Sequence, residues 1–411
     1  MSAESATCTQ KRWLSIVGIG EDGVEGLSSV ARRLISSAEL VVGGARHLEL
    51  AGDLIRGRPI AWPSPMSDAF GEIKRHRGRP VVVLASGDPF HFGVGKQLAA
   101  FVPADQFVCL PQPSAFSLAA ARMGWSLQDV SLVTLHGRAL HGIIRHLQPG
   151  ARILALSWDN TTPARLAELL NARRMGQSLI TVLEAMGGPR ERMRHAQAFN
   201  FAVEPLVPLN TIAIEVIAEP EAAIINLAPG LDDALFEHDG QLTKREIRAV
   251  TLSSLEPRHG ELLWDVGLGA GSIAIEWLLR HPSLSAIGIE ARHDRADRAA
   301  RNAAALGVPE LKIVQGRVPE ALAGLARPDA VFVGGGMTDD GVFEAVWSAL
   351  KPGGRLVANA ISLETEARLA DYFGRFGGDL VRLQVARIDK VGSMSGWRPA
   401  MPVTQWRVRK P

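Results

Sequence analysis

Short apolar runs alternate with segments of helical spacing through the first half of the chain. Residues 13–20 and 38–44 are predicted strands, and residues 81–84 are apolar throughout, as in a strand buried on both faces of a sheet. Residues 27–38 and 112–125 place apolar side chains at helical spacing. Strands that alternate with helices predict an α/β fold with a mainly parallel sheet.

The pattern changes over residues 219–241, which combine prolines, glycines and an acidic cluster and show little periodicity. Such a stretch is typical of a boundary between domains, and 411 residues exceed one ordinary core. We therefore predict two domains, over residues 12–220 and residues 229–411.

The second half starts a new series of alternating elements. A predicted helix over residues 242–255 precedes a strand and glycine loop over residues 261–271, and strands and helices then alternate up to residue 360. This order predicts an open, doubly wound sheet. In the tail, residues 380–391 and 401–410 predict two more strands, arranged as an antiparallel pair.

Composition narrows the classes of function. Lys plus Arg number 45 and Asp plus Glu 43, and the net charge of +2 argues against a nucleic-acid binder. Cys8 and Cys109 are the two cysteines, too few for a disulfide framework or a cysteine-rich metal site. No apolar run has the length of a membrane span, and the leader, residues 1–13, lacks the apolar core of a secretion signal. We expect a soluble cytoplasmic protein without a metal.

The clearest chemical motif lies between a predicted strand and a predicted helix. Asp265, Gly267, Gly269 and Gly271 form a D-x-G-x-G-x-G pattern, in which glycines let the backbone turn tightly and approach a ligand. Glu290 ends the next strand, where a carboxylate accepts hydrogen bonds from ribose hydroxyls. The motif predicts a site for a ligand that contains a nucleoside.

With the turn "LKPGGRLV", residues 350–357, this motif resembles the class I S-adenosylmethionine-dependent methyltransferases. The alternatives are a bound NAD, or a plain turn with an acid nearby. The resemblance implies a Rossmann-like domain and these cofactor contacts: Gly267, Leu268, Gly269, Ala270, Gly271, Glu290 and Gly316.

Two positions depart from related patterns. Arg317 stands where many such enzymes place an acid near the adenine, which puts an adenine contact there in doubt. Residues 334–336 are glycines, where methyltransferases of nucleic-acid amines carry an Asn/Asp-Pro-Pro-aromatic motif. This difference argues against a base amine as the target.

Gly18, Gly20 and Gly23 match G-x-G-x-x-G, yet the surroundings do not fit a dinucleotide loop. The main helix is expected to begin late, with Ser28 or Ser29 as its N-cap, and the next strand ends in glycines instead of an acid. These differences argue against a bound dinucleotide at this loop.

Four segments occur in order through the first half: "VGIGEDGVEGLS", "LASGDPFHFGVG", "PQPSAFSLAAARMGW" and "PLNTIAIEV". Together they resemble the tetrapyrrole (porphyrin/corrin) methylases, the class III methyltransferases, over residues 12 to about 220. That family folds into two α/β subdomains with adenosylmethionine in the cleft between them. The resemblance implies that the first glycine loop, with Gly18 and Gly20, lines the substrate trough. The resemblance implies these cofactor contacts: Gly87, Asp88, Pro89, Ser114, Ala115, Asn210, Thr211 and Ala213.

Two methyltransferase folds in one chain resemble the fused methyltransferases of corrin biosynthesis. The resemblance implies one S-adenosylmethionine per domain, methylation of a corrin precursor at C5 by the first domain, and methylation at C15 with loss of CO2 by the second. It also implies a homo-oligomer, and a threonine near the cofactor at Thr243, which we expect to N-cap its helix.

The substrate carries many carboxylates, so basic side chains near the cleft are expected to bind it. No catalytic acid or base is identifiable. The alternatives are an RNA or protein methyltransferase on the same folds and a non-catalytic adenosylmethionine-binding regulator. The expected substrate contacts are Gly18, Gly20, Arg46, His47, His91, Arg138, Lys244, Arg245 and Arg317.

Overall fold

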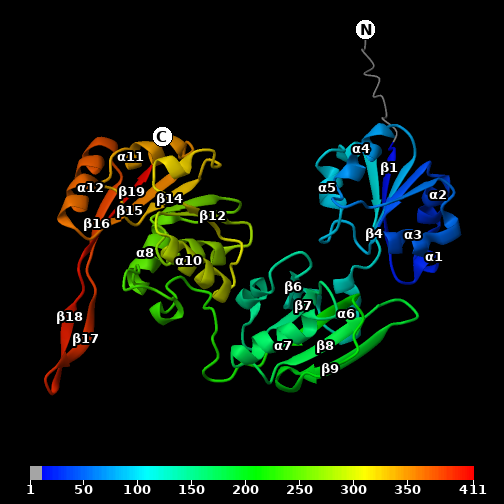
Figure 1. Cartoon of the computed structure of the whole chain (residues 1–411), viewed down its shortest axis with the longest axis horizontal. Coiled ribbons are helices and arrows are strands. Elements are labelled where there is room, and N and C mark those ends of the chain that lie inside the picture. The colour runs from blue at the N-terminus through cyan, green and yellow to red at the C-terminus, as the bar shows by residue number, and fades with distance from the viewer. Residues whose placement is uncertain (1–11) are drawn as a thin grey trace, which may run out of the picture. The chain divides into compact units, whose positions relative to one another are not determined.

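The computed structural model describes residues 12–411 (Figure 1). Most of the leader, with Cys8, lies outside the described residues. The described chain forms two compact units. The first unit comprises residues 12–138 and Gln148–Ala223, and the second comprises Ala139–Leu147 and Ile224–Pro411.

The first unit begins with a five-stranded parallel sheet. In β4, Val81 and Val83 face one hydrophobic cluster, and Val82 and Leu84 face another, so the strand is apolar on both faces. Helices α4 (Asp68–Arg75) and α5 (Gly95–Ala99) cover the first face, and α2 (Ser29–Ser37) and α3 (Ala45–Ala51) cover the second. The strand order is β3 (Arg58–Ala61), β2 (Leu40–Gly43), β4 (Val81–Ser86), β1 (Leu14–Ile19) and β5 (Phe107–Leu110).

The glycine loop after β1 leads into a single helical turn, α1 (Gly23–Gly26), before the longer α2 begins. The Ser28 side chain caps α2 by accepting a hydrogen bond from the Ala31 N–H at 3.2 Å. The prediction of a late helix with a serine cap is confirmed.

The second sheet of the first unit is mixed, so the prediction of a mainly parallel arrangement is wrong here. Only β6 and β7 pair in parallel, and β8, β9 and β10 join by antiparallel pairing. Because a short loop without a helix connects β8 to β9, the chain reverses direction there. Helix α6 (Ala115–Met123) packs on this sheet, and α7 (Thr162–Ala172) follows β7. The strand order is β6 (Val130–Thr134), β7 (Arg152–Leu156), β10 (Asn210–Glu215), β8 (Leu179–Glu184) and β9 (Arg192–Gln197).

The second unit has a seven-stranded sheet, and its doubly wound order confirms the prediction. Five strands pair in parallel, and β19 runs antiparallel to both of its neighbours. The strand order is β13 (Lys312–Gln315), β12 (Ser285–Glu290), β11 (Leu262–Val266), β14 (Ala330–Val333), β15 (Arg355–Ala360), β19 (Val403–Arg409) and β16 (Asp379–Leu383). Its helices are α8 (Arg245–Leu255), α9 (Ser272–Arg280), α10 (His293–Ala305), α11 (Val342–Ala349) and α12 (Leu363–Phe376).

The tail forms four strands where the sequence predicted two. Between β16 and β19 the chain makes a separate hairpin, β17 (Ala386–Val391) and β18 (Met394–Pro399), which projects from the rest of its unit (Figure 1, red). The turn rests on Gly392, whose φ of 62° suits glycine, and this turn signal was overlooked in the sequence.

Candidate active sites

A pocket in the first unit lies where β1 and β4 end, and both sheets of the unit contribute to its wall. Apolar side chains predominate, with a small polar group on one side. Such a lining suits a small organic ligand held by a few oriented contacts. The lining residues are Ile19, Gly20, Glu21, Arg46, Ser86, Gly87, Pro113, Ala115, Leu118, Leu183, Ala185, Met186, Leu209, Asn210 and Thr211.

Gly18 and Gly87 bring two loops into direct backbone contact beside this pocket. A Cβ at Gly18 would lie 1.9 Å from the Gly87 carbonyl oxygen, so no larger residue fits there. Gly87 has a φ of 52°, and its carbonyl accepts a hydrogen bond from the Gln112 N–H at 3.1 Å. The loop predicted to line a trough is therefore packed directly on the loop predicted to hold the cofactor.

Asp88, Pro89 and Ser114 shape the pocket without lining it. The Asp88 carboxylate accepts a hydrogen bond from the Phe90 N–H at 2.9 Å and so stabilises its own turn. The Ser114 hydroxyl accepts from the Ser117 N–H at 3.1 Å and caps α6, whose first residue, Ala115, faces the pocket.

Asn210 offers an unsatisfied acceptor in the pocket wall. Its amide nitrogen donates to the carbonyls of Asp159, Val207 and Pro208 at 3.3, 2.9 and 3.3 Å. Its Oδ1 is buried and has no protein partner within the described chain, a state that ordinarily requires a ligand or water. Ala213, on the same strand, packs in the core and does not reach the pocket.

Arg46, His47 and Ser86 form a polar cluster with Glu21. Arg46 pairs with Glu21 and donates to the Ser86 hydroxyl at 3.0 Å, and the His47 Nε2 lies 2.8 Å from the same hydroxyl. Burial, with the neighbouring Arg46 charge, lowers the pKa of His47 to about 4. His47 is therefore neutral at physiological pH, and it orients Ser86 instead of attracting substrate carboxylates.

In the second unit the glycine loop has the backbone that its sequence predicts. Gly267, Gly269 and Gly271 all have positive φ, at 77°, 57° and 80°. Glu290 lies under the loop: its carboxylate accepts from the Gly269 N–H at 2.9 Å and from the Arg292 N–H at 3.0 Å. A carboxylate can accept about four hydrogen bonds, so acceptor capacity remains for ribose hydroxyls.

Asp265, the first residue of the motif, is fully buried. One carboxyl oxygen accepts from the Ala274 N–H at 3.0 Å, and the other lacks a partner in the described residues. Burial raises the pKa of Asp265 to about 7, and the nearby Glu290 charge adds to this rise.

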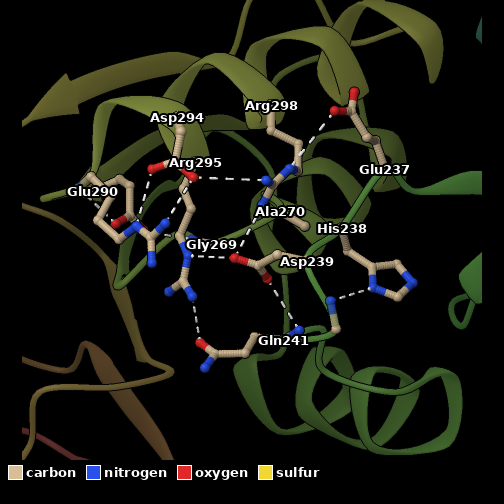
Figure 2. A network of polar contacts seen from close by, with 12 residues as sticks. Glu237, His238, Asp239, Gln241, Gly269, Ala270, Glu290, Asp294, Arg295 and Arg298 are labelled. Carbon is tan, nitrogen blue, oxygen red and sulfur yellow. Dashed lines mark hydrogen bonds and ion pairs between the residues drawn. The ribbon is translucent and has the colours of Figure 1, made fainter.

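A segment that we call the strap, residues 230–243, lies along α10 and reaches the glycine loop. Asp239 pairs with Arg295 at 2.9 Å and Arg298 at 3.2 Å, and Figure 2 shows both arginines pointing toward it. The Gln241 N–H, followed by these arginines, lowers the pKa of Asp239 to about 2. Asn302 joins strap and loop by donating to the Ala270 carbonyl at 2.9 Å and to a strap carbonyl.

A buried ion pair holds the start of the strap. Arg248 on α8 and Glu276 on α9 are both fully buried, with 2.5 Å between Nε and Oε1. Glu276 also accepts from the N–H groups of Gly230 and Leu231 at 2.7 and 2.9 Å. The Thr243 carbonyl accepts from Arg248, while Lys244 is the N-cap of α8, so the prediction of Thr243 as a side-chain cap is wrong.

The remaining predicted contacts are scattered. Arg138, Arg245 and Arg317 are exposed. The His91 ring packs at a tilt against the Phe116 ring beside the Gly87 loop, with 4.8 Å between the ring centroids. Gly316 donates its N–H to the Glu290 carbonyl at 2.9 Å, which places it beside the second motif. Sequence reasoning missed several polar residues of the two sites: Glu21, Asp239, Arg248, Glu276, Arg295 and Arg298.

Residues 12–411 contain neither a metal-binding cluster nor a membrane-spanning helix. No group of three or more His, Cys, Asp or Glu side chains suited to a metal ion occurs there. No helix of this part of the chain has the length and apolar character needed to cross a membrane.

Two protein families match the chain. Residues 14–202 match the tetrapyrrole (corrin/porphyrin) methylases, and residues 234–410 match a precorrin methyltransferase domain. Each match covers most residues of one candidate site.

Individual relatives agree with this division. The chain is 56% identical to the precorrin-6Y C(5,15)-methyltransferase (decarboxylating) of Sinorhizobium sp, over 96% of this chain and 95% of that protein. It is 34% identical to the probable cobalt-precorrin-6B C(15)-methyltransferase (decarboxylating) of Saccharolobus solfataricus, over 39% of this chain and 82% of that protein. It is 28% identical to the cobalt-precorrin-7 C(5)-methyltransferase of Salmonella typhimurium, over 44% and 88%.

Proposed function

This chain belongs to the family of precorrin-6Y C(5,15)-methyltransferases (decarboxylating), and we propose that its two units divide the reactions between them. The protein is a methyltransferase of corrin precursors in cobalamin biosynthesis. We assign methylation at C5 to the first unit. We assign methylation at C15, with loss of CO2 from the C12 acetate, to the second unit, so that precorrin-6Y is converted to precorrin-8.

Separate relatives support this division. One relative is named for C5 methylation alone and one for C15 methylation with decarboxylation, and each aligns with less than half of this chain. The family matches separate the chain between residues 202 and 234, and the two compact units separate within that interval, between Ala223 and Ile224. Two activities that exist as separate proteins elsewhere are therefore joined here.

We propose one S-adenosylmethionine in each unit. In the first, the orphaned Oδ1 of Asn210 supplies an acceptor, and the contact of Gly18 with Gly87 makes a cradle of backbone groups. In the second, the glycine loop and Glu290 supply a backbone cradle and a ribose acceptor. The observation that carries the proposal is the presence of two glycine cradles of different design in one chain.

Methyl transfer requires of the protein mainly that it align the methyl donor with the ring carbon. S-adenosylmethionine supplies a sulfonium methyl group, already a strong electrophile, and the ring carbon is made electron-rich by conjugated nitrogens. Alignment and exclusion of water then account for on the order of 7 kcal/mol of the barrier. For decarboxylation the conjugated macrocycle itself accepts the electron pair.

Mass spectrometry of precorrin-6Y incubated with the full chain and S-adenosylmethionine tests the function. Two methyl groups gained and one CO2 lost are expected. Ala115→Trp, which fills the first pocket, should remove C5 methylation only, and Glu290→Ala should weaken the second site only. Gly71→Ala, with nothing within 4 Å of the added Cβ, is the matched control. Methyl transfer to RNA or protein, with none to the tetrapyrrole, would overturn the proposal.

We also propose that the protein is a homo-oligomer in which the β17–β18 hairpin contacts a second copy. Ile388 and Trp397 pair across the hairpin and are 68% and 74% exposed. An isolated two-stranded hairpin is marginal in water, and a partner surface would cover these side chains. Trp397→Arg should shift the sedimentation coefficient toward the monomer, whereas Lys312→Ala, an exposed position outside the hairpin, should not. An unchanged assembly in Trp397→Arg would contradict the proposal.

A further inference from the structure

Methylation at C5 requires the removal of a proton in addition to the placement of the methyl donor. C5 is a bridging carbon of the macrocycle and carries a hydrogen that the methyl group replaces. One proton must therefore leave, and a positioned side chain that accepts it accelerates the step by about 100-fold to 10,000-fold. No residue of the first unit has so far been given this role.

The first pocket contains one carboxylate. Among its lining residues in the described chain, Glu21 and Arg46 are the charged ones, and Glu21 is the acid. A carboxylate is unexpected at a site where a polyanionic substrate must reach the methyl donor, since it repels the substrate's own carboxylates. Its side chain is 10% exposed, so solvation by water is limited as well.

Two contacts hold Glu21 in place. Arg46, itself oriented by its hydrogen bond to Ser86, forms an ion pair with the carboxylate. On the other side Gly188 packs against it: a Cβ there would lie 2.7 Å from the Glu21 Cβ and 3.1 Å from its carbonyl oxygen. The backbone of the loop after β8 therefore packs directly against Glu21.

Contacts of the Glu191 carboxylate fix the conformation of the loop after β8. The Glu191 carboxylate accepts from the Gly187 N–H at 2.6 Å and from Arg122 at 2.6 and 2.9 Å. Ala185, which lines the pocket, has a φ of 44°, an uncommon conformation for a residue with a side chain. Strained backbone that neighbouring contacts hold in place is frequent at functional sites.

From this geometry we infer that Glu21 is the catalytic base of C5 methylation. The inference rests on the proposed function of the first unit. A π electron pair of the ring forms the C5–CH3 bond while the S–CH3 bond breaks, which leaves a neutral thioether and a cationic ring. The C5–H bond then breaks, its electron pair returns to the ring, and the proton moves to a Glu21 oxygen.

A weak base suffices, because a C–H bond on a cationic ring is strongly acidic. The ion pair with Arg46 therefore does not disqualify Glu21, and it fixes the position of the carboxylate. His47 is not a competitor: it does not line the pocket, and its Nε2 is engaged with Ser86.

The test compares Glu21→Gln with Glu25→Gln in the full chain. Both remove one negative charge from the segment between β1 and α2, but the Glu25 side chain, in α1, is 90% exposed and lies outside the pocket. In Glu21→Gln the rate of C5 methylation should fall by about 100-fold or more, with S-adenosylmethionine affinity and C15 methylation retained. Substrate deuterated at C5 should show a primary isotope effect in this variant, and Glu21→Asp should recover part of the rate.

The outcomes separate two failures. If the wild-type chain adds no methyl group at C5, the proposed function of the first unit is wrong. If the wild type does so and Glu21→Gln is equally fast, only the base is wrong. Loss of S-adenosylmethionine binding in Glu21→Gln, measured by calorimetry, would overturn the base and make Glu21 a ligand-holding residue.

Discussion

Removal of the buried guanidinium of Arg248 should destabilise the second unit by about 4 kcal/mol. In the intact protein, Nε lies 2.5 Å from the Glu276 carboxylate and Nη1 lies 3.0 Å from Asp233. The carbonyl oxygens of Leu231 and Thr243 accept from the remaining N–H groups. Arg248→Met keeps most of the volume but removes all of these donors.

The size of this loss in stability depends on the groups that lose a partner when the guanidinium is removed. Breaking a buried ion pair by deleting one partner costs about 3–5 kcal/mol, because the other charge is left uncompensated. Glu276 would retain two N–H donors, from Gly230 and Leu231, which limits the loss from its charge. Two carbonyl groups would meanwhile lose a partner, at about 1 kcal/mol each. These opposing effects place the expected value near the middle of the range.

Urea unfolding of the full chain measures this loss, and hydrogen exchange at the amides of Gly230 and Leu231 locates it. Both amides donate to Glu276, so their protection should fall with the free energy of unfolding of the second unit. The double variant Arg248→Met/Glu276→Leu should lose less than the sum of the two single variants, because neither charge remains. A loss below about 1 kcal/mol in Arg248→Met, or strict additivity, would refute the reasoning.

Three further outcomes are expected. Gly18→Ala should abolish C5 methylation and spare C15 methylation, because its Cβ would lie 1.9 Å from the Gly87 carbonyl oxygen; a mass-spectrometric assay that finds C5 methylation intact would contradict this. The free energy of unfolding of Asp265→Asn should exceed that of the wild type by an amount that grows as the pH rises from about 4 to about 7. Above pH 7 this difference should stay constant. The reason is that the folded-state pKa of about 7 lies above the ordinary 3.8, so that ionisation of the buried carboxyl progressively destabilises the wild type; a pH-independent difference in urea midpoints would exclude this explanation. Asp239→Asn should weaken S-adenosylmethionine binding at the second site by about threefold, measured by calorimetry against Asp53→Asn, since the exposed strap pairs contribute little each.

Local patterns predicted much of the fold. The first parallel sheet and the doubly wound sheet follow from alternating periodicity, which each segment carries by itself. The direction of the strands in the second sheet of the first unit does not follow from periodicity. It depends on whether a helix intervenes between β8 and β9. The hairpin in the tail escaped notice because the turn at Gly392 interrupts an otherwise continuous strand pattern.

The glycine loops were visible in the sequence because their backbone conformation restricts the residue type. Gly269 and Gly87 have positive φ, and few other residues adopt it. The partners of the strap were not visible: Asp239 and Arg295 are 56 positions apart and each resembles an ordinary surface charge. The position of Glu21 in a pocket could not be predicted either, because distant segments of the chain form that pocket.

The position of β19 between β15 and β16 has a consequence for the order of folding. β16 lies at the edge of the sheet and pairs with β19. Since β19 follows the whole hairpin in the sequence, β16 has no neighbour in the sheet until β19 has been made. During synthesis, residues 379–383 therefore emerge before the strand that they need, and β15 is left with an open edge for the same interval. A chain interrupted before Val403 would keep two unpaired strand edges and should aggregate, whereas its first unit is expected to fold as an independent domain.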